Sequence, residues 1–167
     1  MLISAETPED IEAIRTIQRA AFGRDYEADL VDSLRGDVEP FVSLVARIDD
    51  KPVGHILFTP VALPGTHDIT ILSVAPIAVL PDYQGDGVGS ELVHEGLVMC
   101  EHEGVDGVVA LGGRDFYPRF GFQPAADFGL RTNFPVMQEE FLARELTKDA
   151  FSEAEGTVEY PPQFQQR

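Results

Sequence analysis

The apolar residues near the N-terminus follow a strand pattern first and a helix pattern second. Residues 2–5 are predicted to form a short strand. Beyond it, apolar side chains recur every three or four positions, which gives a helix one apolar face made by Ile11, Ile14, Ile17 and Ala21. Residues 7–10, Thr-Pro-Glu-Asp, carry the signals of a helix start: a capping hydroxyl, a proline at the first helical position and an acid three residues after the cap. We therefore predict a strand followed by a helix that is interrupted at Gly23.

The next stretch indicates a second helix and then several strands. A short helix is expected over Tyr26–Leu34, closed by Gly36. Three β-type runs follow it, at Phe41–Ile48, Pro52–Leu63 and Ile69–Val79. Turn-forming residues separate the runs, which predicts a hairpin turn at 49–52 and a longer loop at 64–68.

The second half of the chain indicates one long helix with strands on either side. The helix is expected at Gly87–Glu103, and the nearly all-apolar run Val105–Leu111 after it is typical of a strand buried on both faces. We further predict a helix of one to two turns at Arg114–Phe120, more strand from Phe122 and a last long strand at Val136–Leu146.

The order of these elements, β-α-α-β-β-β-α-β-α-β-β, predicts a mixed α/β sheet with a strand–helix–strand unit at its centre. A length of 167 residues is typical of one domain, and no repeat or linker divides the chain, so residues 1–167 are expected to form a single domain. The last part, residues 151–167, contains Pro161-Pro162 and is predicted to form a surface tail.

The charge balance excludes several classes of partner. Twelve basic against 29 acidic side chains give a formal net charge of −17, and such a surface repels phosphate backbones and anionic lipid heads. We therefore expect neither a general nucleic-acid binder nor a protein of the membrane surface. No apolar run approaches the roughly 18 residues of a membrane span, and the N-terminus lacks the basic and apolar segments of a signal peptide. The expected location is the cytoplasm.

The acidity itself has two interpretations. It either keeps an ordinary protein in solution or marks a halophilic protein from a cytoplasm of molar salt, where a Debye length of about 3 Å screens self-repulsion. The scarcity of lysine, present only as Lys51 and Lys148, favours the second interpretation. Cys100 is the only cysteine, and His94, Cys100 and His102 point in different directions around one predicted helix, so no metal site is expected.

The stretch from Ala75 to Val93 carries the strongest chemical signal. A predicted strand that ends in Ile77-Ala78-Val79 meets a turn, and Gln84-Gly85-Asp86-Gly87-Val88-Gly89-Ser90 then opens the long helix. Unpaired backbone N–H groups and the helix dipole attract an anion at such a junction, and glycines let it approach closely. A P-loop is disfavoured because no lysine follows the last glycine, and a dinucleotide site because Ser90 stands at the third glycine position. A glycine turn that serves packing alone is the remaining alternative.

Three motifs together resemble the GNAT acetyltransferase superfamily. Gln84-x-x-Gly87-x-Gly89 is similar to its Q/R-x-x-G-x-G/A motif for the pyrophosphate of acetyl-CoA. The motif follows Ala78-Val79 and a Pro-x-Tyr turn, as it does in that family, and the Tyr-Pro-Arg-Phe-Gly-Phe run at 117–122 resembles a branch of small acetyltransferases. The resemblance covers roughly residues 1–146. It implies a central, mostly antiparallel sheet that is split into a V between its fourth and fifth strands and flanked by helices.

The resemblance also implies roles for individual residues. The pantetheine arm of acetyl-CoA would bind the backbone of Ile77, Ala78 and Val79. The pyrophosphate would bind the loop formed by Gln84, Gly85, Asp86, Gly87, Val88, Gly89 and Ser90. A primary amine of a small molecule or peptide would attack the thioester directly, and Tyr117 would protonate the leaving thiolate. The alternative for Tyr117 is an aromatic ring that only packs beneath the sheet.

Two departures from the family pattern leave questions open. Relatives often carry a basic residue in the loop where this chain has Asp86, so acetyl-CoA binding is expected to weaken unless salt screens the charge or Arg114 compensates it. Arg114 and Arg119 would either meet cofactor phosphates or pair with nearby acids. No general base is evident, and the candidates are Glu27, Asp29, Asp68, Thr70 and Ser73.

The acceptor side and the function as a whole each leave more than one interpretation. His55 either is hydrogen-bonded within the core or lines the acceptor pocket. The competing functions are a non-catalytic acyl-CoA-binding module and the transfer of a longer acyl group. The oligomeric state is left open by the sequence, a homodimer included.

Overall fold

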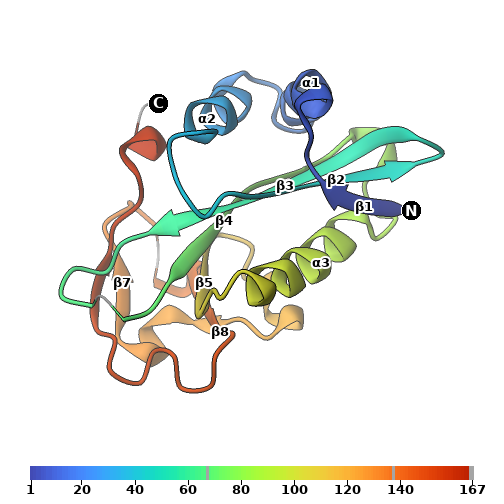
Figure 1. Cartoon of the computed structure of the whole chain (residues 1–167). Helices are drawn as coiled ribbons and strands as arrows, with labels where there is room; N and C mark the ends of the chain where they lie inside the picture. The colour runs from blue at the N-terminus through green and yellow to red at the C-terminus, as the bar shows by residue number, and fades with distance from the viewer. Residues whose placement is uncertain (67, 137, 166–167) are drawn as a thin grey trace.

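A computed structural model describes residues 1–66, 68–136 and 138–165, and it arranges them as a sheet between two layers of helix (Figure 1). The strands are β1 Leu2–Ala5, β2 Val42–Ile48, β3 Lys51–Val61, β4 Ile71–Val79, β5 Gly107–Leu111, β6 Gln123–Pro124, β7 Leu130–Thr132, β8 Phe141–Glu145 and β9 Gly156–Val158. The α-helices are α1 Ile11–Phe22, α2 Tyr26–Leu34 and α3 Val88–His102. Single turns of 3₁₀-helix lie at Pro8–Asp10, Pro81–Tyr83, Tyr117–Phe120, Ala125–Phe128, Gln138–Glu140 and Pro162–Gln165.

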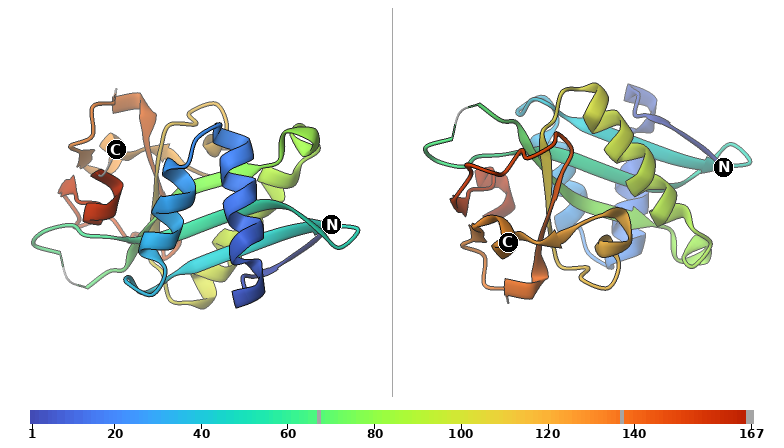
Figure 2. Two further views of the ribbon diagram at one scale, coloured as in Figure 1. Left: turned by 90° about the horizontal axis from the view of Figure 1, so that it is seen from above. Right: turned by 90° about the horizontal axis from the view of Figure 1, so that it is seen from below.

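The main sheet has seven strands in the order β1-β2-β3-β4-β5-β8-β6. Each neighbouring pair is antiparallel except β4 and β5, which run parallel because α3 connects them. Helices α1 and α2 cover one face of the sheet and α3 covers the other (Figures 1 and 2). This arrangement confirms the predicted mixed α/β fold with a mostly antiparallel sheet flanked by helices.

Strands β4 and β5 separate partway along their length. Their parallel register ends where Ser73 lies opposite Val109, whereas β4 stays paired with β3 as far as Val79 opposite Gly54. One edge of β4, from Val74 to Val79, therefore faces the space between two diverging strands. This is the V-shaped split that was predicted between the fourth and fifth strands.

A β-bulge bends β4 at the start of this free edge. The register between β3 and β4 skips Leu57, so Ala75 and Pro76 together oppose that one residue. Proline has no N–H to donate and is tolerated in a strand mainly at such irregular positions. A bulge also bends the strand and increases its local twist, which turns the free edge of β4 away from β5.

The start of the first helix forms as the sequence predicts, with a small shift. The Asp10 carboxylate accepts a hydrogen bond from the Thr7 backbone N–H at 2.9 Å, which is half of a capping box. Pro8–Asp10 is a turn of 3₁₀-helix, so the α-helix proper begins at Ile11. Its apolar stripe lies on the sheet, where Ile14 and Ile17 are fully buried.

The prediction of a surface tail at residues 151–167 is wrong for the part that the structure describes. Phe151, Val158, Tyr160 and Phe164 are buried, and β9 pairs in parallel with β7 in a second, two-stranded sheet. The ring of Phe151 lies so close to Gly107 that a Cβ there would come within 2.3 Å of it. The segment is therefore part of the core, and the Phe151 ring covers the start of β5.

Three further differences concern the length of elements. The helix predicted at Arg114–Phe120 is a single 3₁₀ turn at Tyr117–Phe120, and the strand expected from Phe122 is the two-residue β6. The strand predicted at Val136–Leu146 shortens to β8, Phe141–Glu145, and Met137 lies outside the described residues. None of the helices in the described ranges has the length and apolarity needed to cross a membrane.

Candidate active site

The glycine-rich loop joins the end of β4 to the start of α3. The Gln84 side-chain amide donates a hydrogen bond to the Val79 carbonyl at 3.0 Å, which ties the loop to the strand. Gly85 and Gly87 have φ angles of +86° and +87°, a left-handed conformation that only glycine adopts without strain. At Gly89 an added Cβ would make only ordinary contacts, the nearest at 3.8 Å, which agrees with the glycine or alanine that the motif allows there.

The same loop presents backbone donors in the manner of an anion site. The first helical hydrogen bond of α3 runs from the Glu91 N–H to the Gly87 carbonyl at 3.1 Å. The N–H groups of Val88, Gly89 and Ser90 precede it, so they have no acceptor within the helix. They lie at the positive end of the dipole of a fifteen-residue helix. The geometry fits a phosphate or pyrophosphate held by amides rather than by side-chain cations.

Acidic side chains flank this anion site. Asp86 is exposed, and with Glu91 and Glu95 it borders a shallow pocket of about 480 Å³ next to the N-terminal strand. Arg114, the cation considered as compensation, pairs with Glu139 at 3.5 Å and with Glu140 at 3.7 Å. The pairing interpretation of Arg114 is therefore correct. The pyrophosphate would meet a loop whose nearest charged side chain is negative.

Arg119 behaves differently from Arg114. Its guanidinium lies 4.9 Å from the centre of the Phe116 ring, and its Nε donates to the Phe116 carbonyl at 3.3 Å. Both interactions hold the arginine over the aromatic turn that carries Tyr117. Cys100 is buried, and burial raises the pKa of its thiol to about 12, so it is a protonated core residue at neutral pH.

Tyr117 occupies a tightly packed position at the end of β5. Its ring packs edge-on against Phe116 with centroids 5.1 Å apart and lies 5.2 Å from Phe122. A Cβ on Gly113, where φ is +68°, would come within 2.7 Å of the ring, so this glycine makes room for it. Burial raises the pKa of Tyr117 to about 12, which keeps the phenol protonated at neutral pH. The group is thus a proton donor in the state required of a general acid.

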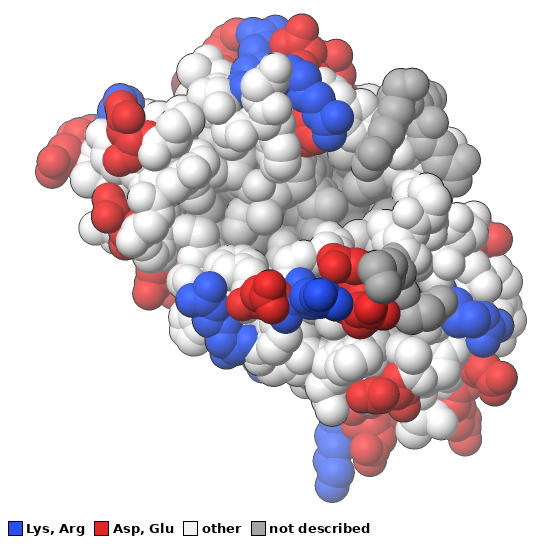
Figure 3. Space-filling view, turned by 180° about the vertical axis from the view of Figure 1, so that it is seen from behind, with Lys and Arg blue, Asp and Glu red and all other residues white. Residues whose placement is uncertain are grey.

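Tyr117 and the free edge of β4 share one cavity of about 610 Å³. Helix α2 and the end of α1 form one wall with Phe22, Arg24, Tyr26, Glu27 and Leu30. The bulged part of β4, residues 74–77, and the end of β5 with residues 111–113, Phe116 and Tyr117 form the middle. Residues 134–136, Tyr160 and Phe164 close the far side. Figure 3 shows the hollow as uncharged surface between two groups of charged side chains.

Of the residues considered as a general base, Glu27 is the one that lines this cavity. The side chain of Glu27 is 7% exposed and pairs with Arg24 at 2.5 Å. Asp29 pairs with Arg15 at 3.0 Å and is not among the described residues that line the cavity. Ser73 is buried and has no hydrogen-bond partner within the described residues. Asp68, Thr70 and Ser73 are likewise absent from the described lining.

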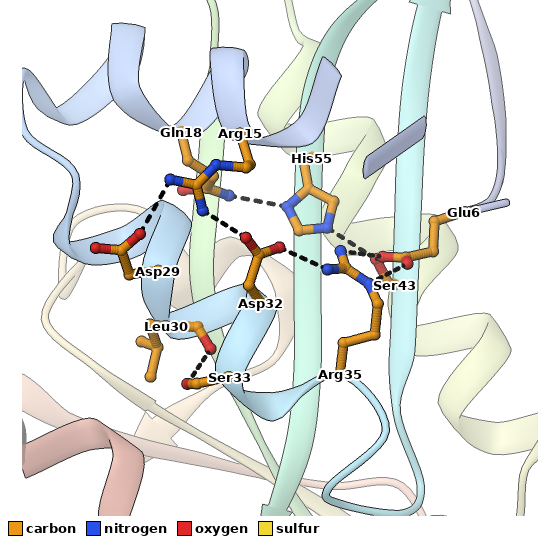
Figure 4. Close-up of polar contacts among 10 residues, drawn as sticks. All are labelled: Glu6, Arg15, Gln18, Asp29, Leu30, Asp32, Ser33, Arg35, Ser43 and His55. Carbon is orange, nitrogen blue, oxygen red and sulfur yellow. Dashed lines mark hydrogen bonds and ion pairs between the residues drawn. The ribbon is translucent and has the colours of Figure 1, made fainter. Parts of the chain in front are cut away.

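His55 belongs to the core rather than to the cavity. It is fully buried, its Nδ1 lies 2.8 Å from the Gln18 amide and its Nε2 lies 2.8 Å from the Ser43 hydroxyl (Figure 4). Burial is the larger cause that lowers its pKa to about 3, and the charge of Arg35 adds to it, so the imidazole is neutral. The prediction of a hydrogen-bonded core histidine is the correct one of the two alternatives.

The polar contacts around His55 continue across the two helices that form the cavity wall (Figure 4). Arg15 on α1 pairs with Asp29 and Asp32 on α2, and Arg35, just after α2, pairs with Asp32 and Glu6. These ion pairs fix α2 against α1 and against β1. They therefore position the wall that carries Glu27.

The structure adds aromatic residues that sequence reasoning missed. Phe134, Tyr160 and Phe164 come from segments predicted as loop or surface tail. The Tyr160 ring stacks edge-on between the other two, with centroids 5.0 Å and 5.2 Å away. The available signal was the presence of Phe151, Tyr160 and Phe164 in a segment that was expected to be exposed.

Comparison with known proteins points to one family. The model of the acetyltransferase (GNAT) family matches residues 11–122. The uncharacterised N-acetyltransferase YhbS of Escherichia coli strain K12 is 38% identical over 165 residues, which is 98% of each chain. The uncharacterised N-acetyltransferase YjhQ of the same strain is 42% identical over 134 residues, 78% of this chain and 74% of that protein.

Solved structures agree with this match. The crystal structure of E. coli YhbS in complex with CoA has a TM-score of 0.92 and 37% identity, and it covers 99% of this chain and 92% of its own. A GNAT acetyltransferase of Brucella melitensis in complex with acetyl-CoA has a TM-score of 0.80 and 32% identity, with coverage of 98% and 97%. Since the family model spans most of the chain and full-length relatives exceed 30% identity, this chain belongs to the GNAT family of N-acetyltransferases.

Proposed function

We propose that the protein transfers an acetyl group from acetyl-CoA to a primary amine of a small molecule or peptide by direct attack. The observation that carries this proposal is that Tyr117 and residues 74–77 on the free edge of β4 line one cavity, and that the same strand continues from that cavity into the amide-rich loop. A thioester and an amine held in that space would react with the advantage of proximity.

The cofactor would extend along β4 toward the glycine loop. Alternate residues of a strand direct their backbone groups to opposite edges, so some N–H and C=O groups among Ile77, Ala78 and Val79 face the split. The pantetheine arm can bind them as an added strand would. The pyrophosphate would then lie at the amides of residues 85–90, with Gln84 bracing the loop. The CoA and acetyl-CoA complexes of the two solved relatives support this proposal.

The chemistry needs one attack and three proton movements. The lone pair of the neutral amine attacks the thioester carbonyl carbon, and the C–S bond breaks as the amide forms. The departing thiolate takes a proton from the Tyr117 hydroxyl, while the nitrogen loses one to solvent or a nearby base. Solvent then returns a proton to Tyr117. General acid transfer of this kind contributes about 10²–10⁴-fold to the rate.

Release of the CoA thiol from acetyl-CoA, followed with a panel of amines, tests the proposal. Amine-dependent release with formation of the acetylated amine is expected. A non-catalytic module would bind acetyl-CoA and release no thiol above the amine-free rate. The same assay with propionyl- and butyryl-CoA tests transfer of a longer acyl group, which is expected to be slower than acetyl transfer.

A further inference from the structure

We infer that the acceptor is a singly charged primary amine on a flat apolar body, with its ammonium group at Glu27 and its body on the aromatic side of the cavity. This inference rests on the proposed function, because it names the substrate class of the same site. The observations behind it are the composition of the cavity wall, the exposure of its rim and the pairing of the Glu27 carboxylate.

Aromatic residues make up a larger share of the cavity wall than of the chain as a whole. Of the nineteen described residues that line the cavity, seven are aromatic and two, Arg24 and Glu27, are charged. The chain has eleven phenylalanines and four tyrosines in all. The far side is an edge-to-face series of Phe134, Tyr160 and Phe164. Such surfaces favour flat apolar groups, because aromatic rings bury a large area and prefer edge-to-face or offset contact.

The rim of the cavity exposes apolar side chains to solvent. Phe22 is 42% exposed on one side and Val136 is 40% exposed on the other, and both belong to the cavity lining. In a chain with a net charge of −17, polar residues are abundant enough to cover such positions. These two side chains extend the apolar lining of the cavity out to its rim.

The carboxylate of Glu27 gives the amine a place to bind. Its side chain is 7% exposed, and a buried carboxylate is stable only when paired. The partner is Arg24, whose Nε and Nη2 lie 3.0 Å and 2.5 Å from the two carboxylate oxygens. Arg24 itself is 54% exposed. An ammonium group that enters the cavity can therefore take over the pairing while the guanidinium turns to solvent. The bound ammonium then gives one proton to Glu27 or to solvent, which frees the lone pair that attacks the thioester.

The charge of the acceptor follows from the same lining. One carboxylate among the described lining residues matches one ammonium group, whereas a polyamine or an amino sugar would need several acidic or hydroxyl partners. The net charge of −17 attracts a cation to the surface as a whole. The structure thus favours an arylalkylamine over a polyamine, an amino sugar or a zwitterionic amino acid.

Titration calorimetry on the protein–CoA complex tests the inference without turnover. 2-Phenylethylamine is expected to bind at least about tenfold more tightly than propylamine, because burial of a ring adds to burial of the chain. Glu27→Gln should weaken both amines about tenfold or more, since it removes a charged hydrogen-bond partner. Arg24→Gln should strengthen both, because it frees the carboxylate. Glu12→Gln, the same change at an exposed position on α1, is the control and should leave both affinities unaltered.

The opposite signs expected for the two variants separate a binding role from a structural one. Equal affinity for the two amines, or a shift in the same direction for Glu27→Gln and Arg24→Gln, would overturn the inference. CoA affinity and the melting temperature of each variant show whether it is folded. Thiol release then separates the two proposals. If 2-phenylethylamine binds and no amine is acetylated, the proposed function fails and the binding inference stands. If spermidine or ethanolamine is acetylated faster than 2-phenylethylamine, catalysis stands and the inference fails.

Discussion

A substitution at Gly113 tests the role of Tyr117 directly, because a side chain there would displace the Tyr117 ring. The change Gly113→Ala has two consequences, one on the backbone and one on the ring. At a φ of +68° an alanine is strained, which costs about 1–2 kcal/mol. The new methyl group would lie 2.7 Å from two atoms of the Tyr117 ring, so the ring must retreat to the 3.4 Å of ordinary contact. The phenol is then displaced by about two-thirds of an ångström or more, and misplacement on that scale reduces rates by about 10- to 100-fold.

A second glycine separates strain from displacement. Gly104, after α3, has a φ of +78° and open space around its Cβ position. Gly104→Ala is therefore expected to lose a similar 1–2 kcal/mol, seen as a fall of about 2–8 °C in Tm, and to keep the wild-type kcat. Gly113→Ala should lose both stability and kcat in the amine-dependent thiol-release assay at saturating acetyl-CoA. A Gly113→Ala protein with the wild-type kcat would refute the claim that the position of the Tyr117 ring matters to the reaction.

Three further predictions test other parts of the account. His55 has a pKa of about 3 in the folded protein against an ordinary value of 6.5. Between these two pH values the unfolded chain binds a proton at His55 that the folded protein does not. The free energy of unfolding should therefore fall by about 1.4 kcal/mol per pH unit as the pH drops from 6.5 toward 3. Chemical denaturation at several pH values should show a shallower fall for His55→Gln, and an identical slope would contradict the assignment. Phe151→Ala should lower the free energy of unfolding by about 3–5 kcal/mol, as expected for a buried core ring. A loss under about 0.5 kcal/mol would instead support the interpretation of residues 151–167 as a surface tail. Asp86→Asn should lower the KM for acetyl-CoA about two- to fivefold in dilute buffer, and the difference should shrink with added salt; tighter binding of acetyl-CoA to the wild-type protein in dilute buffer than in salt would oppose this reading of Asp86.

The parts of the fold that the sequence predicts are those in which local signals agree with long-range packing. The capping sequence at residues 7–10, the stripe over 11–21 and the all-apolar run Val105–Leu111 each specify their element by period and by end signal. The loop at 84–90 is predictable because its conformation needs a positive φ at Gly85 and Gly87, and glycine is the residue that adopts such an angle without strain. The V-shaped split came from the family resemblance and not from periodicity, since it depends on where a parallel register ends.

The parts that escaped prediction depend on contacts between distant segments. β7 and β9 have three residues each and pair in parallel, so neither is long enough to show a strand period. Phe164 is buried because the chain returns to α2, where its carbonyl accepts a hydrogen bond from the Tyr26 hydroxyl at 2.8 Å. Glu27 and Asp29 are two residues apart on one helix, and only the packing of that helix decides which carboxylate reaches the cavity.

The kcat of Tyr117→Phe is the most direct measurement of the central claim. The substitution removes one oxygen atom and keeps the ring between Phe116 and Phe122. Tyr83→Phe, in the turn before the glycine loop, removes the same atom elsewhere and serves as the control. We predict that Tyr117→Phe lowers kcat, measured with both substrates saturating, by about 10²–10⁴-fold. The KM for acetyl-CoA, measured by varying acetyl-CoA, should be unchanged, and the control should keep the wild-type kcat. An unaltered kcat in Tyr117→Phe would remove this phenol from the reaction and contradict the account.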